Sequence, residues 1–174
     1  DCVTCYTVDP RFTNLDRFIA QLRGKPLPSK IFTIHYFVAK AKELEAMGAD
    51  MITLKDMAGL ITPSRAGKII KAFKENLNLP VDFHTHCTPG YGFASALSAI
   101  VHGVDILDTA ILSFAGGPAA PAFELIQIYC DKMGIETGVN REAVVKINKI
   151  LREIRLEMSD LDSYKLFPVD FDIN

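Results

Sequence analysis

The chain has 174 residues, of which 49% are hydrophobic and 23% are charged, and its formal net charge is −2. This composition is typical of one globular domain. Charges of both signs are mixed along the chain, so we expect neither nucleic-acid binding nor direct membrane insertion. No apolar run is long enough to cross a membrane and no signal-peptide layout opens the sequence, so we expect a cytoplasmic protein.

Short apolar runs alternate with amphipathic helical patterns along the chain. In chain order we predict a strand at 2–7, a helix at 33–47, a strand at 50–55, a helix at 63–76, a strand at 80–85, a helix at 92–101, a strand at 104–109, and helices at 121–133 and 141–158. Residues 10–30 give no clear element because Gly24, Pro26 and Pro28 interrupt them. Strands that helices separate must run parallel, so the order predicts an α/β fold.

The cysteines offer a weak metal signal. Cys2 and Cys5 form a C-x-x-C spacing, but no second pair follows at the spacing of a zinc ribbon. Positions three apart on a strand point to opposite faces. We therefore interpret these cysteines as buried or partly buried thiols in a reducing cytoplasm, and zinc or redox chemistry at Cys2 and Cys5 is the minor alternative.

Polar residues stand where two apolar strands end. Lys55 and Asp56 end the second predicted strand, and His84 and His86 end the third. Ligands bind at the carboxyl ends of parallel strands in α/β folds. Two histidines at i and i+2 share one face, so both imidazoles can converge on one metal ion. The alternatives are a polar strand end without a ligand and, for Lys55, an ion-paired or snorkelling lysine.

The segment after the last predicted strand contains Gly116, Gly117 and Pro118 in a row. Adjacent glycines allow a backbone to approach a ligand closely, or simply to turn sharply. Both interpretations remain open from the residues alone.

Three segments resemble the biotin-dependent carboxyltransferases. They are the K-D-M-A-G run at 55–59 with its continuation to 63, the segment 79–90 that contains H-T-H, and residues 103–110; residues 5–7 add a weaker match. That family includes pyruvate carboxylase, the oxaloacetate decarboxylase alpha subunit and the central subunit of methylmalonyl-CoA transcarboxylase. The resemblance covers nearly the whole chain except roughly residues 10–30, which we interpret as an insertion.

The resemblance implies a TIM (β/α)8 barrel, of which residues 1–158 supply strands five to eight and residues 159–174 form a C-terminal extension. We expect the first four strands to come from the same polypeptide before Asp1 or from a partner chain. The inner face of such a half-barrel is expected to carry apolar side chains, namely Ile52, Leu54, Val81, Phe83 and Ile106. If they were exposed, these 174 residues alone would not form a stable monomer.

The resemblance also implies a metal centre. Lys55, in carbamylated form, with His84 and His86 would hold a divalent ion (zinc, cobalt or manganese), and an aspartate of the first strand would complete the set. Asp56 and Thr88 are candidates for orienting these ligands. Gly116 and Gly117 are candidates for contacting biotin.

The implied reaction moves a carboxyl group between carboxybiotin and a 2-oxo acid such as pyruvate or oxaloacetate. Biotin would arrive on a separate carrier domain or subunit, and the enzyme would be a homo-oligomer. Many relatives carry a threonine, thought to shuttle a proton, where this chain has Pro118, so we expect no threonine-based mechanism here. The alternatives are a metal-dependent aldolase or acyl-CoA condensing enzyme of the same barrel group, and a non-catalytic half-barrel assembly partner.

Overall fold

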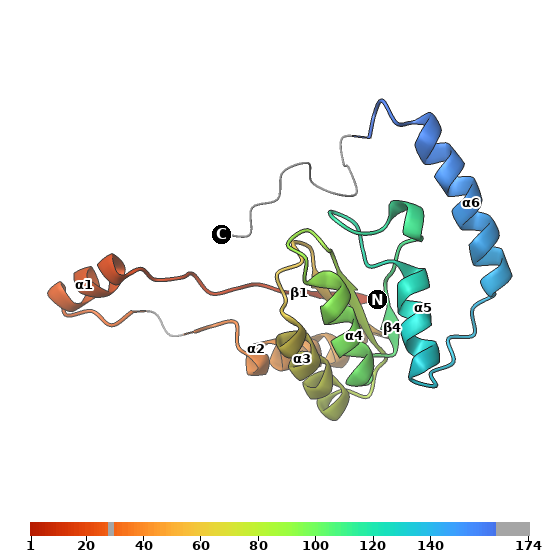
Figure 1. The fold of residues 1–174 in the computed structure, drawn as a ribbon. Helices are drawn as coiled ribbons and strands as arrows, with labels where there is room; N and C mark the ends of the chain where they lie inside the picture. Colours follow the sequence, from red (N-terminus) through yellow and green to blue (C-terminus); the bar gives the residue numbers. More distant parts are fainter. Residues whose placement is uncertain (28–29, 163–174) are drawn as a thin grey trace.

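The computed structural model describes residues 1–27 and 30–162. Its centre is a parallel sheet with the strand order β1-β2-β3-β4 (Figure 1). The strands are β1 (Cys2–Cys5), β2 (Ile52–Asp56), β3 (Val81–Thr85) and β4 (Ile106–Leu107). Each strand pairs in parallel with the next one along the chain, so the predicted α/β fold with a parallel sheet is confirmed.

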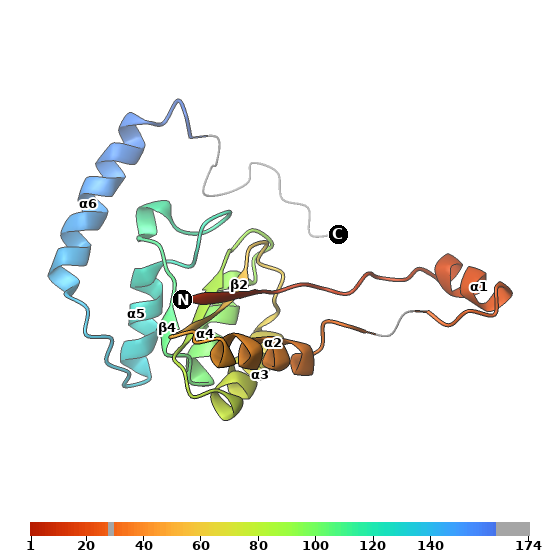
Figure 2. The same ribbon diagram turned by 180° about the vertical axis from the view of Figure 1, so that it is seen from behind.

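Helices return the chain between the strands on one side of the sheet (Figures 1 and 2). They are α2 (Ile34–Ala46), α3 (Pro63–Asn76) and α4 (Gly92–Val101), all within a residue or two of the predicted bounds. Local chemistry fixes their starts. The Thr33 hydroxyl accepts a hydrogen bond from the backbone N–H of Tyr36, and Pro63 occupies the first turn of α3, where a missing N–H costs nothing.

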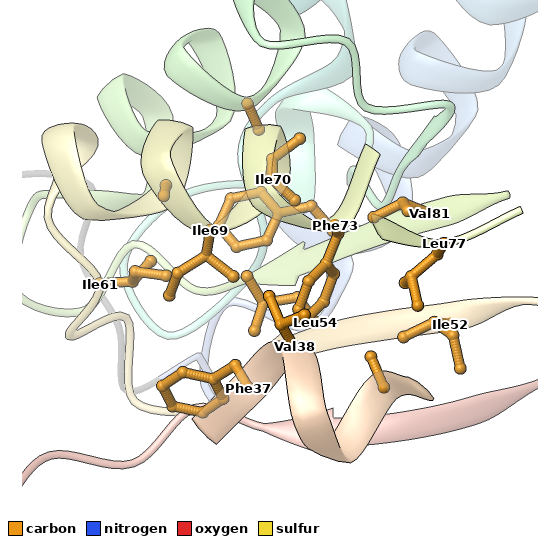
Figure 3. Packing of buried hydrophobic residues seen from close by; sticks show 14 residues of the cluster. Phe37, Val38, Ile52, Leu54, Ile61, Ile69, Ile70, Phe73, Leu77 and Val81 are labelled. Carbon is orange, nitrogen blue, oxygen red and sulfur yellow. The ribbon is translucent and has the colours of Figure 1, made fainter. Parts of the chain in front are cut away.

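The main core lies between these helices and the sheet, on what we call the outer face. Ile52, Leu54, Val81 and Phe83 are fully buried there. They pack with helix residues that recur at helical spacing (Figure 3), namely Phe37, Val38, Ala41, Ala66, Ile69, Ile70 and Phe73. Burying a large apolar side chain contributes about 1.5–3 kcal/mol, so this face supplies most of the stabilisation of the sheet.

The opposite, inner face of the sheet is mainly polar, and the apolar prediction for it was wrong in four positions of five. Ile52, Leu54, Val81 and Phe83 face the helices, whereas Ile106 is 41% exposed on the inner face. Strand side chains alternate, so residues that neighbour the histidines in sequence must point the other way. The inner residues of β2 and β3 are Thr53, Lys55, Asp82 and His84.

Residues 9–27 and 30–33 form an arm that projects from the body and carries a helix, α1 (Asn14–Leu22), near its tip (Figures 1 and 2). The sequence analysis predicted no element here. A local signal existed, because Thr13 and Asp16 form a capping box: the Thr13 hydroxyl accepts from the N–H of Asp16, and the Asp16 carboxylate accepts from the N–H of Thr13.

The last third of the described chain has little sheet structure. β4 is shorter than predicted and continues into a bridge between Ala110 and Ala122 and a 3-10 turn, η1 (Leu112–Phe114). Helices α5 (Phe123–Lys132) and α6 (Arg141–Glu157) follow. α6 is tied to η1 through Ser113, whose N–H and hydroxyl both reach the Asn148 side chain. Of the predicted C-terminal extension, residues 163–174 lie outside the described residues.

Two further expectations can be compared with the described residues. None of the helices in 1–27 and 30–162 has the length and apolar character needed to cross a bilayer. Cys2 is half-buried and packs against the core, whereas Cys5 is exposed, so the prediction of buried or partly buried thiols was wrong for Cys5.

Candidate metal centre

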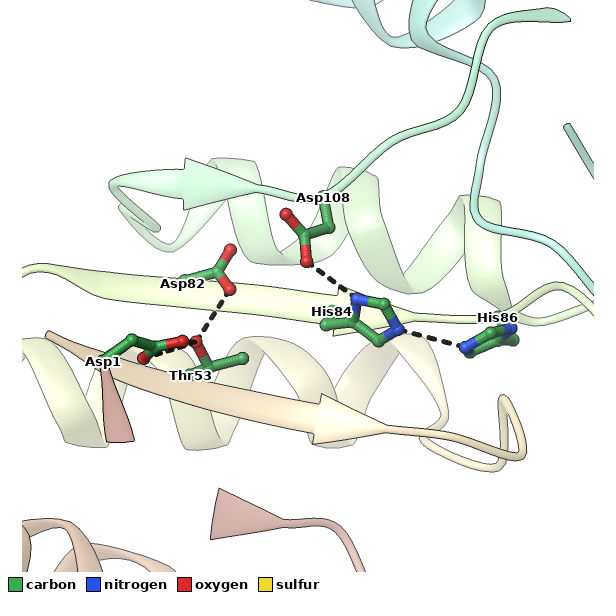
Figure 4. A network of polar contacts seen from close by, with 6 residues as sticks. All are labelled: Asp1, Thr53, Asp82, His84, His86 and Asp108. Atoms are coloured by element: carbon green, nitrogen blue, oxygen red, sulfur yellow. Dashed lines mark hydrogen bonds and ion pairs between the residues drawn. The ribbon is translucent and has the colours of Figure 1, made fainter. Parts of the chain in front are cut away.

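His84 and His86 converge at the carboxyl end of β3, as their spacing predicted (Figure 4). Their Nε2 atoms lie 3.0 Å apart. The other ring nitrogens point outward to fixed partners: His84 Nδ1 lies 2.7 Å from Asp108 Oδ2, and His86 Nδ1 lies 2.6 Å from the carbonyl oxygen of Pro118. The contacts at Nδ1 therefore hold both rings in orientation, with their Nε2 atoms toward each other.

These contacts determine where the ring hydrogens are. A backbone carbonyl and a carboxylate only accept hydrogen bonds, so both Nδ1 atoms carry the hydrogen and donate it. In neutral imidazoles both Nε2 atoms then present lone pairs to each other. Two facing lone pairs at 3.0 Å repel unless a cation lies between or beside them, or unless a second proton on one ring turns the contact into an N–H···N hydrogen bond. A histidine that donates Nδ1–H to a carboxylate or carbonyl while Nε2 faces inward has the usual arrangement of a metal ligand.

Lys55 lies beside His84. The two residues are register partners on adjacent parallel strands, and both belong to the inner face. Neighbouring strands are about 4.8 Å apart, so the lysine stem starts within reach of the histidine pair. Within 1–27 and 30–162, no group of three or more His, Cys, Asp or Glu side chains is placed to hold a metal. Lys55 is thus the residue of the inner face of β2 that stands next to His84 in register.

Asp56 does not join this set, although it follows Lys55 directly. Its side chain is on the outer face and only 1% exposed. The carboxylate accepts hydrogen bonds from the backbone N–H groups of Leu60 and Ile61, both at 2.9 Å, and from the Thr85 hydroxyl at 3.1 Å. These bonds fold the loop after β2 onto the end of β3. The carboxylate that contacts a ring nitrogen of the histidine pair is that of Asp108, which the sequence analysis did not select.

Thr88 contacts the loop that contains Gly116, Gly117 and Pro118. The Thr88 hydroxyl lies 3.4 Å from the carbonyl oxygen of Gly117, and the N–H of Cys87 donates to the carbonyl of Ala119 at 3.0 Å. The loop containing Pro118 is therefore attached to the loop that follows β3. Thr88 helps to hold this pair of loops together and makes no hydrogen bond to either imidazole among those that the structure shows for it.

Two glycines fix the backbone at His86. A Cβ atom at Gly59 would lie 2.3 Å from the His86 carbonyl oxygen, and one at Gly92 would lie 2.4 Å from the same atom. Gly59 also has a φ of +65°, which side-chain-bearing residues rarely adopt. The final glycine of the K-D-M-A-G run thus allows the loop after β2 to pack against the histidine backbone.

A second, separate group of polar contacts lies on the inner face of the same strands (Figure 4). The Thr53 hydroxyl lies 3.0 Å from Asp1 Oδ1 and 2.9 Å from Asp82 Oδ2. A hydroxyl has one hydrogen, so it donates to one of the two carboxyl groups at a time. Burial raises the pKa of Asp82, and the nearby charge of Asp108 adds to this rise, while the bond from Thr53 and the proximity of His84 oppose it.

The fold and the site together define a class: α/β proteins of the parallel barrel type, with a polar centre at the carboxyl ends of the strands. The HMGL-like family model matches residues 28–151, so the chain belongs to the HMGL-like family.

The chain is also similar to individual known proteins. The chain is 38% identical over 127 residues to the pyruvate carboxylase B subunit of Methanocaldococcus jannaschii, an alignment that covers 73% of this chain and 22% of that protein. It is 35% identical over 140 residues to the methylmalonyl-CoA carboxyltransferase 5S subunit of Propionibacterium freudenreichii subsp. shermanii, covering 79% and 28% respectively. The chain therefore spans about a quarter of the length of these two relatives.

A solved structure gives the same result for the fold. The carboxyl transferase domain from Rhizobium etli pyruvate carboxylase with pyruvate and biocytin matches 96% of this chain and 26% of that chain, with a TM-score of 0.77 and 29% sequence identity. The resemblance to carboxyltransferases is therefore confirmed.

Proposed function

We propose that this chain is the metal-binding part of a biotin-dependent carboxyltransferase that acts on a 2-oxo acid. One observation carries the proposal: the Nε2 atoms of His84 and His86 face each other at 3.0 Å while both Nδ1 hydrogens are committed elsewhere. The similarity to the pyruvate carboxylase B subunit supports the choice of reaction.

The residues present fit a divalent ion of the zinc, cobalt or manganese type, for which imidazole is a suitable ligand. His84 and His86 would hold it through Nε2. Lys55 cannot be a ligand as an ammonium, but addition of carbon dioxide to its free amine gives a carbamate with two oxygen donors and releases a proton. When bound, the ion supplies positive charge beside the 2-oxo oxygen of the substrate.

The protein's own groups then have separate tasks. Asp108 and the Pro118 carbonyl keep the hydrogens on Nδ1 of the two imidazoles, so the Nε2 lone pairs stay available. In the transfer from oxaloacetate, the C3–C4 bond breaks and a bond forms between the carboxyl carbon and the ureido nitrogen of biotin. The proton that this nitrogen loses goes to C3 and gives pyruvate. Pro118 has no hydroxyl hydrogen to offer, so a side chain at this position does not relay the proton.

We further propose that four more strands complete the barrel and the site. The sheet ends at β1 on one side and at β4 on the other, and neither edge has another strand beside it among the described residues. Strands from the first half of a barrel would pair with these two open edges. The biotin carrier, a homo-oligomeric state and a cytoplasmic location remain predictions of the same proposal.

The test uses the complete protein that contains this chain, with His84→Ala and His86→Ala combined. We expect the metal content to fall from about one ion per chain to background, because the variant loses both imidazole ligands. Carboxyl transfer from oxaloacetate to free biotin should fall to the uncatalysed level. Elemental analysis and a pyruvate-release assay measure the two quantities.

The matched control combines His35→Ala and His102→Ala, the two other histidines, which removes the same number of imidazoles at residues that share no hydrogen bond with His84 or His86 among the described residues. The control should keep metal and activity. Unchanged metal stoichiometry in the His84 and His86 variant would refute the metal centre. Full metal content without transfer to biotin in the unaltered protein would favour the aldolase or condensing-enzyme alternative.

A further inference from the structure

The arm, residues 9–27 and 30–33, occupies a distinctive place relative to the metal centre. It leaves the carboxyl end of β1 and continues in the direction of that strand, beyond the sheet, before the chain returns to α2 (Figures 1 and 2). The strands are parallel, so Lys55 and His84 also lie toward this end of the sheet. The arm therefore extends into the space in front of the candidate site.

The helix on the arm has an apolar side that the described chain leaves uncovered. No residue of α1 is buried. Leu15, Phe18 and Leu22 are 64%, 56% and 70% exposed, and their spacing of three and four residues places them in one stripe along the helix. A nine-residue helix is too short to be stable from propensity alone, so such a stripe calls for a protein surface to pack against.

The charged residues of the arm indicate what kind of protein surface would pack against it. The arm contains five basic residues, Arg11, Arg17, Arg23, Lys25 and Lys30, and only two acidic ones, Asp9 and Asp16, within a chain of net charge −2. Both carboxylates already accept hydrogen bonds from backbone N–H groups of the arm itself. The arm thus presents cations next to an apolar stripe, which complements an acidic surface with an apolar centre.

We infer that the arm is the docking surface for the biotin carrier, a domain that would present an acidic, partly apolar face. This inference rests on the proposed function. A carrier must bring biotin to the carboxyl ends of the strands, which is the direction in which the arm extends. The missing strands of a barrel would instead join the open edges of the sheet, at β1 and β4, to the side of the arm.

The experiment compares free biotin with biotin on its carrier as acceptor from oxaloacetate, in the complete protein. Arg17→Glu and Arg23→Glu are combined at the arm helix, where both side chains are exposed. We expect kcat/KM for the biotinylated carrier to fall by about tenfold or more at low salt, because the steering charge is reversed, and the deficit to shrink as salt is added. The value for free biotin should stay within about twofold, which also shows that the fold is intact.

The matched control combines Lys146→Glu and Lys149→Glu, an equal charge change on exposed positions of α6, which lies on the other side of the molecule from α1 (Figures 1 and 2). This control should leave kcat/KM unchanged both for free biotin and for the biotinylated carrier. Equal loss for the carrier in both double variants, or none in the arm variant, would overturn the docking surface. So would a change of sedimentation coefficient in the arm variant alone, since the arm would then bind a second copy. Failure of the unaltered protein to carboxylate free biotin would count against the proposed function instead.

Discussion

The two faces of β2 and β3 show how one pair of strands serves two purposes. On the outer face, Leu54 and Phe83 are fully buried under the helices. On the inner face, their neighbours Lys55 and His84 lie side by side in register. A shift of a single position along a strand exchanges a side chain of the core for one of the site.

Proximity in sequence to the site is therefore a poor guide to a role in it. Asp56 and His84 are both polar and both stand at a strand end, yet Asp56 folds a loop on the outer face and His84 belongs to the candidate metal centre. The face on which a strand residue lies decides which quantity its substitution should change: the free energy of unfolding or the affinity for metal.

The largest expected effect is on the outer face. Phe83→Ala should lower the free energy of unfolding by about 3–5 kcal/mol, because it removes a fully buried ring and leaves a cavity between the sheet and the helices. Denaturant unfolding of the complete protein, freed of metal with a chelator, measures this without the stabilisation that a bound metal adds. His84→Ala, one position further along on the other face, should cost less than about 1 kcal/mol. Similar losses for both variants would contradict the division between the faces.

Asp56→Asn should have the next largest effect and lower the free energy of unfolding by about 2–3 kcal/mol. The amide would lose the charge and direct an NH2 group at one of the three donors that now point to the carboxylate. Exposed Asp50 provides the control, and Asp50→Asn should stay within about 0.5 kcal/mol. A large loss of metal affinity in Asp56→Asn with unchanged stability would instead restore the ligand-orienting role that the sequence suggested.

Asp108→Asn should weaken metal binding by about 10–100-fold and change stability little. The carboxylate accepts the Nδ1 hydrogen of His84 on the inner face, and loss of such a partner makes the imidazole a poorer and less well oriented ligand. Competition with a chromogenic chelator measures the affinity. Asp105→Asn is the control on the same segment, because Asp105 pairs with Lys74 and should not influence the metal.

The smallest effect is expected at Pro118. Pro118→Thr should change metal affinity by about twofold or less and should not lower turnover, because His86 is held by the backbone carbonyl, which any residue provides. The added hydroxyl could alter the choice of carboxyl acceptor, which a comparison of 2-oxo acids would detect. A large fall in turnover with intact metal would show that the proline ring itself is needed in this loop.

Local sequence patterns were enough to predict the regular part of the molecule. Apolar periodicity and glycine and proline breaks predicted α2, α3 and α4 closely, and strand alternation predicted that His84 and His86 would share a face. These are local properties, decided by neighbouring residues and repeated at fixed spacing. The same alternation could have assigned Phe83 to the outer face, since it stands next to His84.

Tertiary packing alone determined which distant groups complete the site and which do not. Asp108 and the Pro118 carbonyl reach the histidines from 24 and 32 residues away, and no local pattern specifies such a contact. Local sequence also could not predict that the arm projects from the body, although the Thr13 capping box marked the start of α1. Nor could it predict that Asp56 accepts hydrogen bonds from the loop that follows it. Long-range packing places these groups, because it fixes which strand ends and loops come to lie together in space.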